Sequence, residues 1–401
     1  MRTVEEHQRV IAELVTARPP ASVGVADALG LVLAADVTAP LSLPVFDNSA
    51  MDGYAVRADD VAAATPDSPV NLPVAEDIPA GRTDRLSHAA GTAHRIMTGA
   101  PVPRGADAVV PVESTDGGTE TVTISSSAKA GQHIRRAGGD VTEGTTVLRN
   151  GDVVTPAALG LAAALGLVEL SVVQRQRVLV VSTGTELVAP GTPLEPGQIY
   201  ESNALMLAAA AREAGAEVVA VATSSDDVDQ FRAVLQAHPD VDVVLTSGGV
   251  SAGAYEVVKD AFAADGATGV EFVKVAMQPG MPQGAGRLAD GRAIVTLPGN
   301  PVSALVSFEV FLRPALRAAM GLPDAQRPQR SAVLAESLTS PQGKRQFRRG
   351  VYDEQAGTVT SYGPPASHHL RWLASANCLL DVPADTAGMS AGESVRIWDL
   401  R

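Results

Sequence analysis

The region from Arg177 to Pro301 alternates short apolar runs with amphipathic segments. Residues 178–181 are all apolar, which predicts a strand that is buried on both faces of a sheet. The same patterning predicts strands at 217–222, 241–246, 272–275 and 293–297, helices at about 203–214, 227–237 and 255–264, and a further helix that begins at Pro301. Strands that alternate with helices predict βαβ units and a parallel sheet, whose ligands bind beyond the carboxyl ends of the strands.

The pattern differs on both sides of this region. An N-terminal helix is expected because Val4, Ile11 and Leu14 fall on one helical face, and Thr3 and Glu6 have the spacing of a capping box. Further on, short extended runs rich in Gly, Pro, Thr and Val predict a small β domain, which is followed by a helix at 157–170. After Pro323 no helix is expected, and strands are predicted at 331–338, 346–352, 358–362, 379–382 and 394–398.

Composition and charge restrict the possible functions. A chain of 401 residues is long enough for several domains. The net charge of −14, from 45 acidic and 31 basic residues, argues against a general nucleic-acid binder, which would present a basic face. The single cysteine excludes an intrachain disulfide. Residues 1–15 do not have the pattern of a signal peptide, and no apolar stretch is long enough to cross a bilayer, so a cytoplasmic protein without membrane contact is expected.

Three glycine-containing segments follow predicted strands. They are Ser182-Thr183-Gly184-Thr185-Glu186-Leu187, Thr246-Ser247-Gly248-Gly249-Val250-Ser251-Ala252-Gly253 and Leu297-Pro298-Gly299-Asn300-Pro301-Val302-Ser303. Hydroxyls and free N–H groups beside glycine can hold an anion, and a helix that begins after Asn300 favours negative charge at its N-terminus. Each segment is also compatible with a plain turn between a strand and a helix. Three of them at the same sheet edge favour a binding site.

Two more segments lie in the predicted β domain. In Asp47-Asn48-Ser49-Ala50-Met51-Asp52-Gly53-Tyr54-Ala55, two carboxylates, an amide and a hydroxyl suit a hard cation such as Mg²⁺, although Asp52-Gly53 is equally compatible with a simple turn. Met97-Thr98-Gly99-Ala100-Pro101 reads as a turn beside a strand. Two other features favour a structural interpretation: His368-His369 has no evident third metal ligand, and a lone cysteine such as Cys378 is usually a small buried apolar residue.

Taken together, these segments resemble the molybdopterin molybdenumtransferase family, which includes the bacterial MoeA enzyme and the E domain of gephyrin. Further matching stretches are Ile134-Arg135-Arg136 and Gly197-Gln198-Ile199-Tyr200, and all of the stretches occur in the family's order over nearly the whole chain. The resemblance implies an enzyme that inserts molybdate into adenylylated molybdopterin, releases AMP and forms the molybdenum cofactor. It also implies Mg²⁺ or another divalent cation.

The resemblance implies a fold of the α/β plus β class, in an elongated multidomain subunit. The expected parts are a discontinuous N-terminal linker and helical domain at 1–45 and 136–176, an inserted β domain at 46–135, a three-layer parallel-sheet α/β domain at 177–325 that binds molybdopterin, and a barrel-like C-terminal β domain at 326–401. A homodimer is implied, with its site at the subunit interface. The adenylyltransferase that precedes this step and molybdoenzymes are possible protein partners.

Functional residues carried over from the resemblance fall into three overlapping groups. The expected catalytic residues are Asp52, Thr98, Asp140 and Glu186. The expected metal ligands are Asp52, Asp140 and Glu186, because carboxylates beside an anionic substrate need a bridging cation. The expected substrate-binding residues are Ser182, Thr183, Gly184, Ser247, Gly248, Gly249, Ser251, Glu256, Pro298, Asn300, Pro301, Ser303, Arg349 and Ser375. Ser303, Arg349 and Ser375 are assigned to the oxyanion.

The chain departs from the family pattern at several positions. Thr185, Glu201 and Glu256 stand where Asp is usual, and Gln278 and Met281 stand where the family commonly carries Lys. Each charged hydrogen bond lost to an oxyanion is worth about 1.5–3 kcal/mol. Lys259, Lys274, Lys344 and Arg345 are candidates for a compensating cation.

Two alternative functions remain open at this point. One is a catalytically weak paralogue that holds molybdopterin or acts as a scaffold, which the loss of both lysines motivates. The other is a molybdopterin adenylyltransferase or nucleotide pyrophosphatase of the related α/β fold. Such proteins share the Ser-Gly-Gly and Pro-Gly-Asn-Pro loops, but they lack the Asp47–Tyr54 segment and the C-terminal β domain.

Overall fold

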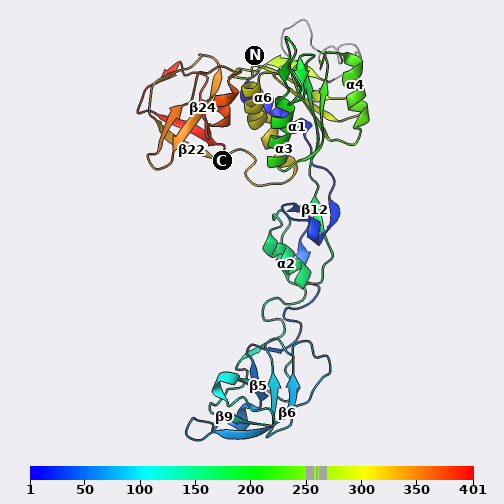
Figure 1. Ribbon diagram of the computed structural model, residues 1–401, viewed down its shortest axis with the longest axis vertical. Coiled ribbons are helices and arrows are strands. Elements are labelled where there is room, and N and C mark those ends of the chain that lie inside the picture. The colour runs from blue at the N-terminus through cyan, green and yellow to red at the C-terminus, as the bar shows by residue number, and fades with distance from the viewer. Residues whose placement is uncertain (250–256, 259–260, 262–268) are drawn as a thin grey trace. The chain divides into compact units, whose positions relative to one another are not determined.

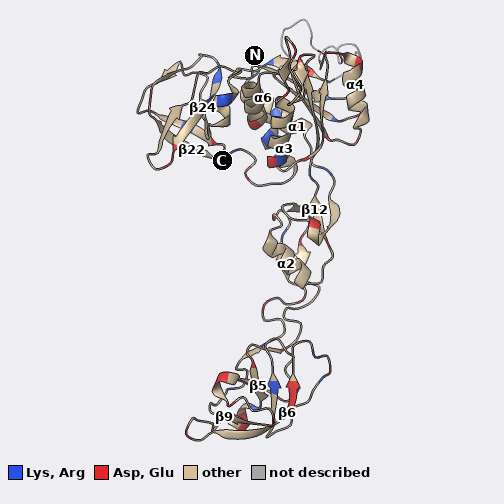
Figure 2. Cartoon of the chain, viewed as in Figure 1, with Lys and Arg blue, Asp and Glu red and all other residues tan. Residues whose placement is uncertain are grey.

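The computed structural model describes residues 1–249, 257–258, 261 and 269–401, which form two compact units (Figure 1). Unit 1 comprises Met1–Ala21 and Ser171–Arg401, and unit 2 comprises Ser22–Leu170. Acidic and basic residues are interspersed along the chain in both units (Figure 2). Among the described residues, no helix combines the length and the apolar character needed to cross a bilayer.

A six-stranded sheet forms the centre of unit 1. Its order is β16 (Glu217–Ser224), β13 (Arg177–Thr183), β17 (Val243–Ser247), β21 (Ala293–Leu297), β20 (Pro282–Arg287) and β18 (Glu271–Lys274). The first four strands are parallel, as the βαβ pattern predicts, whereas β20 runs antiparallel to both of its neighbours, β21 and β18. The sequence pattern missed β20 because this strand is rich in glycine rather than in apolar residues. A Cβ at Gly286 would lie 2.1 Å from the Gly269 carbonyl oxygen, so only glycine allows this close backbone approach.

Helices cover both faces of this sheet. Val178 and Val180 of β13 pack in the same core as α1 (Val4–Leu14), α3 (Asn203–Glu213) and α6 (Pro301–Ser307). Leu179 and Val181 point to the other face and pack against α4 (Val228–Ala237). This alternation gives the three layers expected from the sequence. The Thr3–Glu6 capping box at the start of α1 is confirmed.

The remaining elements of unit 1 extend these layers. The helix that begins at Pro301 continues through a π-helical turn at Phe308–Leu312 into α7 (Arg313–Ala319). A short parallel pair, β14 (Leu187–Val188) and β15 (Ile199–Tyr200), follows the first loop. The helix predicted at 255–264 falls mostly outside the described residues, and of that range only 257, 258 and 261 are described, all of them helical.

The C-terminal part of unit 1 is a closed five-stranded barrel. It consists of β22 (Gln329–Leu334), β24 (Arg345–Asp353), β25 (Thr358–Ser361), β26 (Cys378–Val382) and β28 (Ser394–Asp399), and β24 closes it by pairing with β26. A two-stranded ribbon, β23 (Leu338–Thr339) and β27 (Gly388–Met389), lies outside the barrel. The expectation that no helix follows Pro323 is wrong: α8 (Leu370–Ala374) is a single turn, too short to produce a helical periodicity in the sequence.

The α/β domain is connected to the barrel by strand pairing as well as by the chain itself. The short strand β19 (Met277–Gln278) pairs in parallel with β24, so that Met277 lies opposite Arg345 and Gln278 opposite Gln346. This pairing fixes the start of β24 beside the segment that follows β18.

Unit 2 contains a five-stranded sheet with its own apolar core. The order is β8 (Ala108–Pro111), β5 (Gly53–Val56), β7 (Ala93–Ile96), β6 (Val70–Ile78) and β9 (Thr121–Ile124). Short 3₁₀ turns lie at Val25–Asp27, Ala58–Val61 and Val112–Ser114, and shorter strands are β1 (Ala21–Gly24), β2 (Val32–Leu33), β3 (Val37–Thr38), β4 (Asn48–Ser49), β10 (Ile134–Arg135) and β11 (Thr146–Leu148).

The helix predicted at 157–170 is shorter than expected. It forms α2 (Pro156–Ala164), which the Thr155 side chain caps at its N-terminus. Gly166, with a φ of 75°, follows the end of the helix, and the chain continues as β12 (Glu169–Val173), which pairs with β1 and β2.

Candidate functional site

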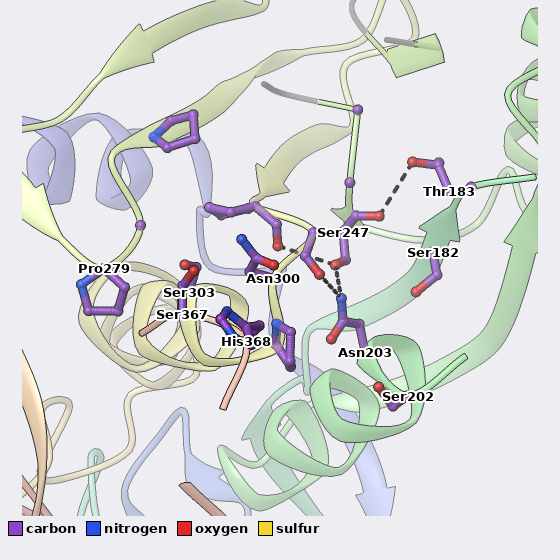
Figure 3. A pocket seen from close by; sticks show the side chains of 18 of the residues that line it. Ser182, Thr183, Ser202, Asn203, Ser247, Pro279, Asn300, Ser303, Ser367 and His368 are labelled. Carbon is purple, nitrogen blue, oxygen red and sulfur yellow. Dashed lines mark hydrogen bonds between the residues drawn. The ribbon is translucent and has the colours of Figure 1, made fainter. Parts of the chain in front are cut away.

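A cavity of about 960 Å³ lies in unit 1, at the carboxyl ends of the parallel strands (Figure 3). The three predicted loops line it with Ser182, Thr183, Gly184, Glu186, Ser247, Gly248, Gly249, Pro298, Asn300, Pro301 and Ser303. Two further predicted residues, Ser251 and Glu256, lie outside the described residues. The cavity is large enough for a nucleotide-sized ligand.

The loops are tied to one another by side-chain hydrogen bonds. Asn203, at the start of α3, donates from Nδ2 to Ser247 Oγ at 2.9 Å and to the Gly299 carbonyl at 2.5 Å. Gly248 has a φ of 97°, and a Cβ there would lie 2.8 Å from the Thr183 carbonyl oxygen, so the second loop can approach the first only with glycine at this position. Figure 3 shows Asn203 reaching toward Ser247 below the second loop.

Two departures from the family pattern have structural roles here. Glu201 accepts hydrogen bonds from Ser182 Oγ and from the Ala204 backbone N–H, both at 2.7 Å, and thereby joins the first loop to the start of α3. Thr185 donates from Oγ1 to Asp226 at 3.1 Å. The carboxylates of Glu201 and Asp226 thus accept hydrogen bonds from within the unit. In the described part of the chain, by contrast, nothing donates a hydrogen bond to the Glu186 carboxylate, which also lines the cavity.

The barrel side contributes residues that the sequence reasoning did not assign to the site. Ser367 and His368 line the cavity, and the Ser367 carbonyl accepts a hydrogen bond from the Val302 N–H at 3.1 Å, which places this segment beside α6 (Figure 3). The only sequence signal for His368 was the His-His pair, whose interpretation as a metal site was set aside. Ser375, predicted for the oxyanion, does not line the cavity and donates instead to the Arg371 carbonyl at 3.1 Å.

Of the candidate compensating cations, only Lys344 lines the cavity among the described residues. Arg345 is committed elsewhere: it forms ion pairs with Asp381 at 2.7 Å and with Glu5 at 2.6 Å. Lys274 is exposed on β18, and Lys259 lies outside the described residues. Gln278 and Met281, the positions of the replaced lysines, both line the cavity.

Arg349 lies in a second, smaller pocket that shares Gln278, Pro279 and Pro365 with the main cavity. Its side chain is only 4% exposed, and its guanidinium donates to the backbone carbonyls of His369 and Pro364. In the described structure no carboxylate pairs with it. Burial and the neighbouring Arg348 lower its pKa, because both oppose the charged form. A buried guanidinium without a counter-ion is suited to an anion.

In unit 2, Asp52 and Thr98 are brought together by strand register. Gly53 of β5 lies opposite Ile96 of β7, so Asp52, which precedes β5, lies close to Thr98, which follows β7. Asp52 Oδ1 accepts hydrogen bonds from the Thr98 N–H at 2.6 Å and from its hydroxyl at 2.8 Å. These two bonds lower the pKa of Asp52 and keep it ionised, which leaves its second oxygen for a cation.

Asp140, the third expected ligand, is exposed in a loop of unit 2 whose backbone is held by Leu43. The expected ligands therefore belong to both units: Asp52 and Asp140 to unit 2, Glu186 to unit 1. Among the described residues, no three His, Cys, Asp or Glu side chains are grouped closely enough to hold a metal ion.

Comparison with known proteins accounts for most of the chain. Residues 2–166 match the family model described as the MoeA N-terminal region (domain I and II), residues 179–318 match the probable molybdopterin binding domain, and residues 331–400 match the MoeA C-terminal region (domain IV).

Full-length relatives agree with the family models. The chain is 70% identical to molybdopterin molybdenumtransferase 2 of Mycobacterium tuberculosis over 100% of both chains, and 36% identical to molybdopterin molybdenumtransferase of Bacillus subtilis over 94% of this chain and 89% of the relative. A crystal structure of the MoeA protein from Pyrococcus horikoshii superimposes with a TM-score of 0.80 at 28% identity, covering 100% of this chain and 99% of the other. The chain therefore belongs to the MoeA family.

Proposed function

We propose that this protein is a molybdopterin molybdenumtransferase, which inserts molybdate into adenylylated molybdopterin and releases AMP. The observation that carries the proposal is that the strand-end cavity adjoins the pocket of the buried Arg349 guanidinium, with which no carboxylate among the described residues pairs. The cavity offers hydroxyls and backbone groups to a nucleotide-like ligand, and Arg349 offers positive charge to an oxyanion. The full-length relatives that carry this name support the same reaction.

We assign different roles to Arg349 and to the serines that line the cavity. Arg349 does not line the main cavity, but its charge acts through the shared wall, because charge interactions extend over several ångströms in a protein interior. We assign it to stabilising molybdate and the negative charge that develops when the phosphoanhydride breaks. We assign to Ser303, 4% exposed at the start of α6, and to Ser367 beside it the donation of hydrogen bonds to the same anion, because both line the cavity.

A divalent cation, with Mg²⁺ the first candidate, fits the oxygen donors that are present. Among the described residues, nothing donates a hydrogen bond to the Glu186 carboxylate in the cavity, and Asp52, which is kept ionised, accepts hydrogen bonds at only one of its two oxygens. Carboxylates are the ligands that hard cations prefer, and Asp52, Asp140 and Glu186 would hold the ion. When bound, it would polarise the phosphoanhydride and neutralise the leaving AMP.

A homodimer is part of the proposal, because the family resemblance implies that residues of one subunit complete the site of the other. Light scattering at micromolar concentration tests the assembly, and a monomer would contradict it. A cytoplasmic location is also proposed, because it suits a biosynthetic enzyme of this kind.

The test of the reaction is single-turnover release of AMP from adenylylated molybdopterin, with and without molybdate, in the presence of Mg²⁺. We expect release that requires both molybdate and the cation. Tight pterin binding without molybdate-stimulated release of AMP would indicate a binding protein of the same fold rather than an enzyme. Hydrolysis independent of molybdate would indicate a nucleotide pyrophosphatase.

A further inference from the structure

The described lining of the cavity carries more negative than positive charge. Glu186, Glu201 and Asp226 contribute carboxylates, and Lys344 contributes the only lysine or arginine among the described lining residues. The proposed ligand is itself an anion. In a cavity whose lining carries more carboxylates than basic side chains, the basic side chain has to lie beside the anionic group of the ligand. Lys344 is partly buried, and no carboxylate in the described structure pairs with its ammonium group.

Strand geometry places Lys344 on the cavity side. It immediately precedes β24, and successive side chains at the start of this strand point to opposite sides. Arg345 points away from the cavity to Asp381 and Glu5, whereas Lys344 lines the cavity. The adjacent Arg345 cannot replace it, because both of its guanidinium ends are already engaged.

Next to Lys344, the side chain of Gln278 is oriented by a neighbour. Gln346 donates from Nε2 to Gln278 Oε1 at 2.7 Å, across the register pair of β19 and β24. The carbonyl of the Gln278 amide is therefore occupied, and its two N–H donors remain for a ligand. In the cavity lining, Gln278 supplies neutral donors and Lys344 supplies a cation.

We propose that Lys344 binds the phosphoanhydride of the adenylylated pterin, and that this contact replaces positive charge missing at Gln278 and Met281. An ammonium group on a flexible stem suits a phosphate group, which accepts it from many directions. Arg349 has a fixed position held by two carbonyls, and it serves the oxyanion of molybdate. The inference rests on the proposed function, because it names the part of that substrate which Lys344 contacts.

The experiment compares Lys344→Ala and Lys344→Arg with the wild-type enzyme in steady-state AMP release. Lys274→Ala is the matched control, because Lys274 is an exposed lysine outside the cavity. We expect Lys344→Ala to raise the KM for adenylylated molybdopterin about 10- to 100-fold, the range for one lost charged hydrogen bond. The kcat and the KM for molybdate should stay close to those of the wild type, Lys344→Arg should restore most of the affinity, and Lys274→Ala should change nothing.

Each other outcome contradicts a different part of the argument. An unchanged KM for the pterin nucleotide in Lys344→Ala, in an active enzyme, overturns the inference and leaves the proposed function intact. A raised KM for molybdate alone would overturn the assignment to the phosphoanhydride. If the wild type releases no AMP, the proposed function fails. Calorimetric binding of inorganic pyrophosphate to the wild type and to Lys344→Ala then tests whether Lys344 binds a phosphoanhydride. Weaker binding to Lys344→Ala supports this role of Lys344, and equal binding overturns it.

Discussion

The strand ends give the cavity Ser182, Ser247 and the carboxylate of Glu186, whereas the barrel segments give it Lys344 and His368. We refer to these as the α/β flank and the barrel flank. Hydrogen bonds join the hydroxyls of Ser182 and Ser247 to neighbouring side chains of the α/β flank, and the carboxylates of this flank make it locally acidic. On the barrel flank, no carboxylate among the described residues pairs with Lys344. A ligand that carries both a cation-binding group and an anionic group is therefore stabilised in one orientation only. In that orientation the cation-binding group lies at the α/β flank and the anionic group at the barrel flank.

The largest expected effect comes from the acid of the α/β flank. Glu186→Ala should lower the rate of molybdate-dependent AMP release by about 10²–10⁴-fold, as should Asp52→Ala, because each removes a carboxylate assigned to the divalent cation. Glu186→Asp, which keeps the charge, should retain part of the activity. A full rate in Glu186→Ala would show that the acidity of this flank has no part in the reaction.

The same pair of variants tests the proposed dimer. If each site takes Asp52 from one subunit and Glu186 from the other, a heterodimer of the two inactive variants contains one intact site. Co-expression with two affinity tags should then yield a mixed dimer with about half of the wild-type activity, because one of its two symmetric sites is complete. A mixed dimer as inactive as its parents would place both residues in the site of the same subunit.

The second prediction contrasts two arginines of β24. Arg349→Met should lower kcat/KM about 10²-fold, because it removes an unpaired positive charge and the support of the segment around Pro364 and His369. Arg345→Met should instead lower the free energy of unfolding by about 3 kcal/mol, because it leaves the fully buried Asp381 with fewer partners. Chemical denaturation and AMP release measured on both variants separate the two effects. Equal losses of stability would show that Arg349 is structural as well.

The third prediction extends the comparison to unit 2, where Asp52, unlike Glu186, is held by two hydrogen bonds. Both come from Thr98 and lower the pKa of Asp52, so its ionised form persists to lower pH. Thr98→Ala removes the hydroxyl bond and retains the backbone bond, which is the larger cause. The acid limb of the pH–rate profile should therefore move to higher pH, with the rate at neutral pH little changed. An unmoved limb would mean that Asp52 does not control it.

The pattern of apolar and polar residues predicted the fold well where local signals were strong. The parallel strands were identified as short apolar runs, and the five barrel strands were identified because apolar and polar residues alternate along them. Glycine-rich β20 and the single turn α8 were missed because neither has a periodic pattern. The four-part domain division and the boundaries that accompany it stay predictions, and the structure itself presents two units.

The site was predictable where it is local in sequence and less so where it is assembled in space. The three loops were located because glycine and hydroxyl residues follow apolar strands, and the parallel sheet brings them together. Asn203, Lys344, Ser367 and His368 depend on how the barrel and α3 pack against the loops, which no local pattern records. Ser375, one of the three residues assigned to the oxyanion, does not line the cavity, whereas Ser367, eight positions earlier in the chain, does.

The smallest expected effect belongs to the boundary between the flanks. Gln278 lines both the main cavity and the pocket of Arg349, and it now offers neutral donors. Gln278→Lys would add a charged donor, and a charged hydrogen bond is about twice as strong as a neutral one. Part of the gain is offset by repulsion from the buried Arg349 and by loss of the bond from Gln346. We therefore expect only about a threefold lower KM for molybdate. A KM that rises would mean that positive charge on this wall is already sufficient, and that the neutral amide is the better match to Arg349.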